Sequence, residues 1–249
     1  MQKRAVERAL ADVASFADPE ASLEQYPTPT DVAAHLCHVA AMRGDVADAL
    51  VVDLGAGTGR LALAAALYEP AAVVGVEFDA DALATARRNE RRVDPPTPVW
   101  WLRADASRSP LCLGGLDGLE DLGDLGDLDG LEDLGERQSD TTDDEEATTP
   151  ARVTVVANPP FGAQTGNEHA DRAFLETVAA TAGECSLPVV SYTLHNEGSA
   201  SFVESFVEDA GGRVTDAFAV TLDLNAQFAH HTADRVQIQT ELFRVAWTD

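Results

Sequence analysis

Four residues, Asn158-Pro159-Pro160-Phe161, follow an apolar run and have the composition of a reactive turn. Two consecutive prolines lack backbone N–H donors, so the strand predicted over 152–158 must end there in a stiff turn. The Asn158 side-chain oxygen and the Pro159 carbonyl can accept both hydrogens of a planar amine, while the Phe161 ring can stack on an extruded base. The motif therefore predicts a site that binds a flat amino group through hydrogen-bond acceptors and a stacking ring. A purely structural turn, with Phe161 in the core, is the alternative.

A second motif, "VVDLGAGTGRLALAAAL" over 51–67, joins a predicted strand to a predicted helix. Gly55 and Gly57 allow a tight turn and the close approach of a ligand, and the start of the helix offers free N–H groups. The Gly-x-Gly-x-Gly spacing differs from the Gly-x-Gly-x-x-Gly pattern of dinucleotide folds. Simple chain reversal is the alternative for the glycines taken alone.

Acidic residues lie at the ends of the first three predicted strands: Asp53, Glu77 and Asp105. Glu77 is suited to binding two ribose hydroxyls, and Asp105 could accept a hydrogen bond from an adenine amino group. Together with the glycine turn, the three carboxylates predict a site for S-adenosylmethionine rather than for a nicotinamide cofactor.

Apolar runs that alternate with helical patterns position these motifs. Strands are expected at 49–54, 71–78, 98–104, 152–158, 187–194, 213–222 and 236–247, with helices at 29–43, 58–68, 80–92, 168–182 and 199–210. Such alternation predicts a parallel sheet with helices on both faces. Only a loop separates the last two strands, so they should pair antiparallel. We expect a single α/β domain over 1–249, a Rossmann-like class I methyltransferase fold with seven mostly parallel strands and the last strand antiparallel.

Residues 111–150 interrupt this pattern, with leucine at every third position from Leu113 to Leu134. A period of three fits neither a helix nor a strand. Glycine and aspartate fill the positions between the leucines, which is typical of low-complexity sequence. The segment is predicted to be an acidic, disordered insert. A calcium-binding repeat is the alternative, but its spacing matches no known calcium loop.

The formal net charge is −26, from 25 Asp and 18 Glu against 16 Arg and a single lysine, Lys3. An acidic balance normally argues against a nucleic-acid partner. However, the loss of lysine with arginine retained indicates adaptation to high salt, and at about 1 M salt charges are screened beyond about 3 Å. We therefore interpret the chain as halophilic, and its charge does not exclude nucleic acid. An acidic interaction protein is the alternative.

The three cysteines (Cys37, Cys112 and Cys185) are scattered and form no Cys-x-x-Cys pair, so no metal site is expected. The first sixteen residues carry charges that argue against a secretory signal, and their apolar spacing predicts a short amphipathic helix. Because no apolar run is long enough to cross a membrane, a cytoplasmic location is expected.

Several segments resemble the methyltransferase-like protein 5 family of adenine-N6 methyltransferases, which act on small-subunit ribosomal RNA. The matching segments are "LEQYPTP" (23–29), "VVDLGAGTGRLA" (51–62), "VGVEFDADALATARRN" (74–89), "ANPPFG" (157–162), "HADRAFLE" (169–176), "SYTLHNEGS" (191–199) and the closing "FRV" (243–245). The resemblance covers nearly the whole chain except 111–150. "EQYPTP" is its most specific part, because the Asn-Pro-Pro-Phe motif is shared with other amino methyltransferases.

The resemblance implies a role for each matching residue. Gln25 and Thr28 would close over the cofactor, and Gly55, Thr58 and Arg60 would line its methionine moiety. Glu77 would bind its ribose, and Asp105 with the Ala106 backbone would bind its adenine. Asn158 through Phe161 would hold the target base. Two features depart from the family. Glu77 stands where an aspartate is usual, and the loop after the sixth strand reads "AQFAHHTADR" (226–235) instead of being rich in lysine.

The resemblance also implies two partners, ribosomal RNA and a small zinc-binding activator protein that adds a strand to the sheet edge. Trp100 and Trp101 could anchor that interface, although a core position is as reasonable for either one.

Three other functions remain open. Methylation of a release-factor glutamine amide uses a similar turn, but usually with tyrosine in place of Phe161 and with a separate helical substrate domain, for which residues 1–45 are too short. DNA adenine or cytosine methylation normally requires a target-recognition domain. A catalytically inactive scaffold is the third, and the intact motifs argue against it.

Overall fold

A seven-stranded sheet forms the centre of the computed structural model, which describes residues 1–20, 24–108, 149–160, 170–225 and 235–247. The strands are β1 (Ala49–Leu54), β2 (Ala72–Glu77), β3 (Val99–Arg103), β4 (Arg152–Ala157), β5 (Val189–Asn196), β6 (Arg213–Asn225) and β7 (Arg235–Ala246). Their order is β3-β2-β1-β4-β5-β7-β6, and every pairing is parallel except those of β7, which is antiparallel to both β5 and β6. The expected sheet with its reversed last strand is confirmed.

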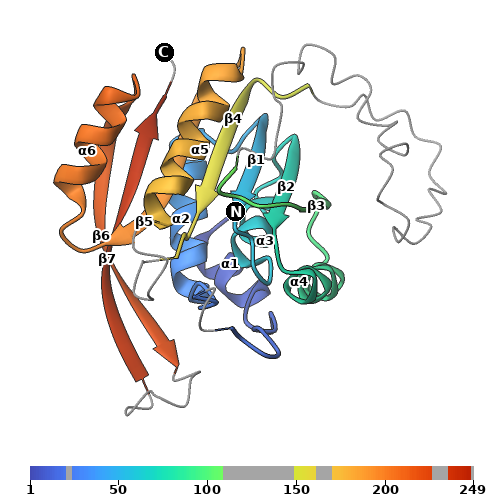
Figure 1. Cartoon of the computed structure of the whole chain (residues 1–249). Coiled ribbons are helices and arrows are strands. Elements are labelled where there is room, and N and C mark those ends of the chain that lie inside the picture. Colours follow the sequence, from blue (N-terminus) through green and yellow to red (C-terminus); the bar gives the residue numbers. More distant parts are fainter. Residues whose placement is uncertain (21–23, 109–148, 161–169, 226–234, 248–249) are drawn as a thin grey trace.

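Helices cover both faces of the sheet (Figure 1). They are α1 (Lys3–Ala9), α2 (Thr30–Met42), α3 (Arg60–Ala66), α4 (Ala80–Val93), α5 (Ala170–Glu184) and α6 (Ala200–Asp209). Apolar residues of α1 to α4 form one core cluster with one face of the sheet, and those of α5 and α6 form a second cluster on the opposite face. All six residues of β1 are buried, as expected of a parallel strand covered on both sides.

The ends of most elements differ from the expectation by one to three residues. Helix α3 begins at Arg60 rather than at 58, because Gly59 precedes it with φ of +88°, a left-handed conformation outside the helical range. Strands β6 and β7 extend past the other strands as a long hairpin (Figure 1). The expected insert at 111–150 lies almost entirely outside the described residues. Within the described residues, no helix is both long and apolar enough to cross a membrane.

A buried carboxylate, Asp45, joins the start of β1 to the last strands. It accepts hydrogen bonds from the Tyr192 hydroxyl on β5 at 2.6 Å and from Nε and Nη2 of Arg244 on β7 at 2.8 and 3.1 Å. The bond to Asp45 raises the pKa of Arg244, and burial raises the pKa of Tyr192. These hydrogen bonds hold β5 and β7 to the segment that precedes the central strand β1.

A second buried carboxylate, Asp53, joins β1 to α3. Its Oδ2 accepts a hydrogen bond at 2.8 Å from the backbone N–H of Ala62, one of the N–H groups that the helix itself leaves unpaired. Its Oδ1 is buried and has no hydrogen-bond partner among the described residues. Burial raises the pKa of Asp53 from an ordinary 3.8 to about 7, although the bond from Ala62 acts in the opposite direction.

The Asp45 network predicts a large effect of Arg244→Met. Removing one partner leaves the Asp45 carboxylate buried and undercompensated, so the free energy of unfolding should fall by about 3 kcal/mol. Arg172→Met is the matched control, since its pair with Glu176 on α5 is 54% exposed on both sides and should cost below about 0.5 kcal/mol. Urea unfolding at fixed salt measures both, and equally small losses would contradict the role of the network.

Asp53 predicts how stability depends on pH. Its pKa of about 7 in the folded chain exceeds the ordinary 3.8, so the folded state binds more protons between these values. The free energy of unfolding should therefore fall as pH rises through that window. Comparing urea unfolding of the wild type and Asp53→Asn across the window isolates this contribution, which the variant should lose. An unchanged pH slope in Asp53→Asn would assign the dependence to other groups.

Candidate functional site

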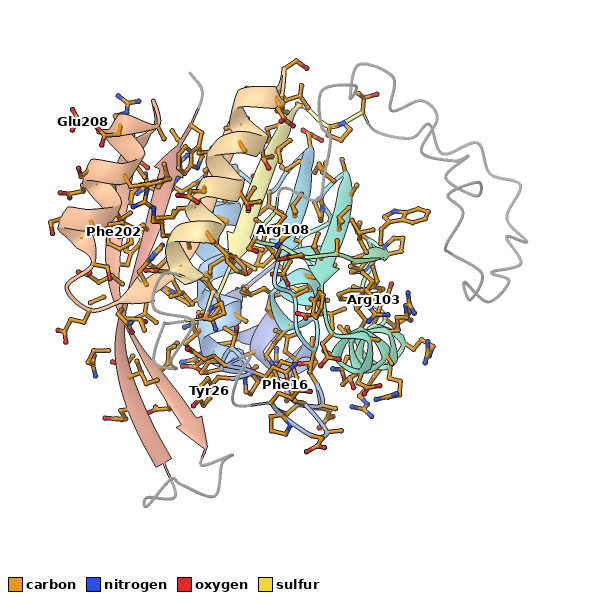
Figure 2. All side chains as sticks on the ribbon, viewed as in Figure 1. Phe16, Tyr26, Arg103, Arg108, Phe202 and Glu208 are labelled. Carbon is orange, nitrogen blue, oxygen red and sulfur yellow. The ribbon has the colours of Figure 1, made fainter. Side chains whose placement is uncertain are left out.

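A cavity of about 380 Å³ opens at the carboxyl ends of β1, β2 and β4, where open α/β sheets bind ligands. Its volume falls in the usual range for small-molecule sites. Its walls come from the glycine turn after β1, from the ends of β2, β3 and β4, and from the segment between α1 and α2. In Figure 2, Phe16 and Tyr26 of that segment lie beyond the carboxyl ends of the central strands.

The glycine turn forms one wall. Gly55 and Gly57 have φ of +72° and +55°, conformations that other residues rarely adopt. A Cβ on Gly57 would lie 2.9 Å from the Phe16 ring, and one on Gly55 would lie 3.1 Å from the Phe174 ring. Thr58 completes the turn and also lines the cavity. Both glycines are therefore required for conformation and for space.

Glu77, at the end of β2, holds this turn in place. Its Oε2 accepts a hydrogen bond from the Gly57 N–H at 2.7 Å, and its Oε1 accepts one from the Asp79 N–H at 2.9 Å. Burial raises the pKa of Glu77, and these backbone bonds act in the opposite direction. Each carboxylate oxygen can accept a further hydrogen bond, so Glu77 can still accept from two hydroxyls in the cavity.

Asp105 and Ala106, after β3, form the next part of the wall. Oδ1 of Asp105 accepts from the Ser107 N–H at 3.0 Å and from its hydroxyl at 2.6 Å, and Arg108 lies 3.2 Å from Oδ2. The Ser107 hydroxyl is the main cause of a lowered pKa of Asp105, so this carboxylate is charged at neutral pH. It can accept hydrogen bonds from a polar ring edge.

One predicted cofactor residue lies elsewhere. Asp53 is not among the residues that line the cavity, because its side chain points beneath α3 and bonds to Ala62 there. Its contribution is to hold α3 behind the glycine turn, which corrects the expected direct contact with a ligand.

The segment between α1 and α2 closes one side of the cavity. Gln25 donates from Nε2 to Asp79 Oδ2 at 2.7 Å, and Arg60 donates to the main-chain carbonyls of Thr28 at 2.7 Å and Val13 at 3.1 Å. Gln25, Thr28 and Arg60 all line the cavity, and their contact with a cofactor stays a prediction. Arg60 thus has a second role, since it fastens the segment to the start of α3.

Aromatic residues of the cavity escaped the sequence analysis: Phe16, Tyr26, Phe78 and Phe174. Phe78 directly follows Glu77 in the sequence, and this place after an acidic strand end could have indicated a cavity residue. In the structure its side chain is 60% exposed. Phe16 and Tyr26 lie in an irregular segment without hydrophobic periodicity. Only the three-dimensional structure brings Phe16 against Gly57.

Asn158 follows β4 and lines the cavity. Strand β1 lies between β4 and β2, the strand that ends with Glu77, so Asn158 and Glu77 lie on either side of the glycine turn. Nδ2 of Asn158 donates to the Thr28 hydroxyl at 3.0 Å, while its Oδ1 is buried and has no hydrogen-bond partner among the described residues. A buried acceptor without a partner costs about 1–3 kcal/mol. A ligand N–H in the cavity would satisfy it.

The other residues of the motif are placed differently. Pro160 lines the cavity, and Pro159 is buried and does not line it. Phe161 lies outside the described residues, so stacking on a base stays a prediction. Within the described part of the chain, no three His, Cys, Asp or Glu side chains are grouped so that they could hold a metal ion.

Comparisons with known proteins agree with this geometry. A family model described as a methyltransferase domain matches residues 51–119, which include the glycine turn and Glu77. A crystal structure from Pyrococcus horikoshii, described as that of a candidate RNA methyltransferase, is 26% identical, with a TM-score of 0.72 over 99% of this chain and 98% of that one. The fold is therefore a Rossmann-like class I methyltransferase fold.

Two curated relatives match almost end to end. The rRNA N6-adenosine methyltransferase Mettl5 of Drosophila melanogaster is 27% identical over 98% of this chain and 96% of its own length. The rRNA N6-adenosine methyltransferase METTL5 of Danio rerio is 25% identical over 98% of both chains. With the fold and the cavity as described, the chain is similar over almost its whole length to rRNA N6-adenosine methyltransferases of the methyltransferase-like protein 5 type.

Proposed function

We propose that the chain is an S-adenosylmethionine-dependent methyltransferase that methylates N6 of an adenine in RNA, with small-subunit ribosomal RNA as the substrate. The observation that carries this proposal is the buried Oδ1 of Asn158, an acceptor that has no hydrogen-bond partner among the described residues and lies on a residue of the same cavity as the glycine turn. The two full-length relatives, which are named for this activity on rRNA, support it.

The cavity walls suit the two halves of such a cofactor. Glu77 would accept hydrogen bonds from the ribose hydroxyls, and Asp105 with the Ala106 backbone would bind the adenine. Phe78 is exposed beside Glu77 and offers a ring face for stacking. The glycine turn would let the methionine part approach the backbone closely. When bound, S-adenosylmethionine supplies an electrophilic methyl group.

The Asn-Pro-Pro corner would position the target amine. An adenine amino group is a poor nucleophile because its lone pair is delocalised into the ring. Asn158 Oδ1 would accept one of its two hydrogens and so help to turn its lone pair toward the methyl donor. Pro159 does not line the cavity, so its carbonyl is not assigned the other hydrogen. The nitrogen gives up a proton to solvent once it carries the methyl group, so no residue is needed as a general base. Rate acceleration would come from positioning and from fixed dipoles.

The architecture around the site gives less support to the alternative substrates. A release-factor methyltransferase would need a separate helical domain for its protein substrate. Here Val6 of α1, the following Leu10 and Leu36 of α2 belong to the core beneath the sheet. The N-terminal helices are thus part of the methyltransferase core, which favours RNA adenine over a glutamine amide.

We also propose a heterodimer with a small zinc-binding activator that pairs with β3. This strand is the edge of the sheet, and its Trp100 is 46% exposed. Trp101 was an equal candidate for this interface, but it is 8% exposed, packs over Gly59 and Gly75, and donates to Glu90. Trp100 alone is therefore the proposed anchor. Given the net charge of −26 and the single lysine, we place this assembly in a cytoplasm of high salt.

Asn158→Ala tests the proposed reaction. Removing a preorganised polar group should slow methyl transfer by about 100-fold, or about 3 kcal/mol, while affinity for S-adenosylmethionine is retained. Mass spectrometry of nucleosides from small-subunit rRNA incubated with each protein measures N6-methyladenosine, and calorimetry measures cofactor binding. Transfer at the wild-type rate would remove the proposed role of the amide. Methylation of a release factor or of DNA, with none on rRNA, would overturn the substrate.

Trp100→Asp tests the proposed partner. Loss of a central aromatic anchor should weaken the heterodimer by about 2 kcal/mol, or about 30-fold. Titration calorimetry with the purified zinc-binding protein measures the affinity. Phe202→Asp on α6 is the matched control, since it places the same charge at another exposed aromatic residue. Equal affinities for the wild type and Trp100→Asp would exclude this edge as the interface.

A further inference from the structure

We propose that Thr28 is a positioning residue for Asn158: its hydroxyl binds the amide nitrogen and so holds the amide plane with Oδ1 free to accept from the target amine. The inference rests on the proposed function, because that amine is the adenine N6. It concerns the part of the site that binds the target base, whereas the family resemblance implied only that Thr28 closes over the cofactor.

The Asn158 amide needs such a partner. Its nitrogen offers two donors and its oxygen only acceptors, so a rotated amide would present N–H groups to the N–H groups of the target. The hydrogen bond from Nδ2 to the Thr28 hydroxyl, 3.0 Å long, gives the nitrogen an acceptor on the side away from the free oxygen. Thr28 is 8% exposed and Asn158 Oδ1 is buried, so a rotation of the amide would take from Nδ2 the acceptor that it has in this conformation.

Thr28 is itself firmly held. It is buried, and Arg60 donates from Nη1 to its main-chain carbonyl at 2.7 Å. It stands between Pro27 and Pro29, and proline fixes its own φ and restricts the residue before it to extended conformations. Gln25 fastens the same segment to Asp79 at 2.7 Å. The hydroxyl therefore has a defined position, although it lies 130 residues from Asn158 in the sequence.

The common structural role for a threonine at this place is absent. Thr28 lies one residue before the N-cap position of α2, at which a hydroxyl often caps the free N–H groups of a helix. The N-cap of α2 is Pro29, and no side chain caps this helix. The hydroxyl thus has its one described hydrogen bond with Asn158.

Three variants separate the possible roles of Thr28. Thr28→Val keeps the shape of the side chain and removes the hydroxyl, Thr28→Ser keeps the hydroxyl, and Thr30→Val makes the same change two residues away, at a position that does not line the cavity. If Thr28→Val does not fold, Thr28→Ala removes the same hydroxyl and takes its place in every comparison.

The first measurement requires no substrate. The chain has five asparagines, so asparagine labelled with a nitrogen isotope gives few side-chain amide signals in NMR spectra, and the signal lost in Asn158→Ala assigns its own. We expect the Asn158 amide protons to shift upfield and to exchange faster with solvent in Thr28→Val, and to stay near their wild-type positions in Thr28→Ser and Thr30→Val. An unchanged Asn158 signal in Thr28→Val would overturn the inference, whatever the substrate is.

The second measurement is kinetic. In Thr28→Val, kcat on rRNA should fall by about tenfold, the scale of one lost hydrogen bond, with little change in the Kd for S-adenosylmethionine. Thr28→Ser should restore kcat. A loss confined to cofactor affinity would make Thr28 a cofactor contact, and equal loss in Thr28→Ser would make its methyl group the important part; either result overturns the inference. Absence of rRNA methylation in the wild type would instead refute the proposed function and leave the NMR result to decide.

Discussion

The hydrogen bond from the Gly57 N–H to the Glu77 carboxylate organises the site, because it joins the turn after β1 to the end of β2. The Glu77 carboxylate also accepts a hydrogen bond from the Asp79 N–H. The Asp79 side chain in turn accepts one from the Asp81 N–H, which caps α4, and one from the Gln25 side chain. One partly buried acid thus aligns a turn, the start of a helix and the segment over the cavity. Burial raises the pKa of Glu77, and the backbone hydrogen bonds from Gly57 and Asp79 act in the opposite direction.

The fold could be predicted largely because the parallel strands carry uninterrupted apolar runs between amphipathic helices. The position of Asp53 could not be read from its place beside the turn, but strand geometry contains the answer. Alternate residues of a strand face opposite sides, and Val51 packs in the cluster formed with α1 to α4 whereas Val52 and Leu54 pack in the other. Asp53 shares the side of Val51, so its carboxylate points beneath α3 and cannot reach over the strand ends.

The same alternation separates the two tryptophans of β3. Neighbouring residues on a strand face opposite sides of the sheet, so only one of Trp100 and Trp101 could pack in the cluster formed with α1 to α4. The glycines decide which. A Cβ on Gly75 would lie 2.5 Å from the Trp101 ring and one on Gly59 would lie 2.6 Å from it, so the ring occupies the space that two missing side chains provide. Contacts between such distant residues are not visible to any local pattern, which is also why Phe16 and the pairing of Thr28 with Asn158 were missed.

Recognition by an acidic protein requires a different balance of forces from that of a basic RNA-binding protein. With a net charge of −26, long-range attraction for phosphate is not available, and at about 1 M salt it would be screened beyond about 3 Å in any case. Affinity for RNA must then come from short-range contacts that salt does not weaken, such as ring stacking and hydrogen bonds in a closed cavity. The described cavity offers this kind of contact: the ring of Tyr26 and an amide oxygen without a hydrogen-bond partner among the described residues. A site that binds the base itself, rather than the backbone around it, is the kind that can function on a surface of this charge.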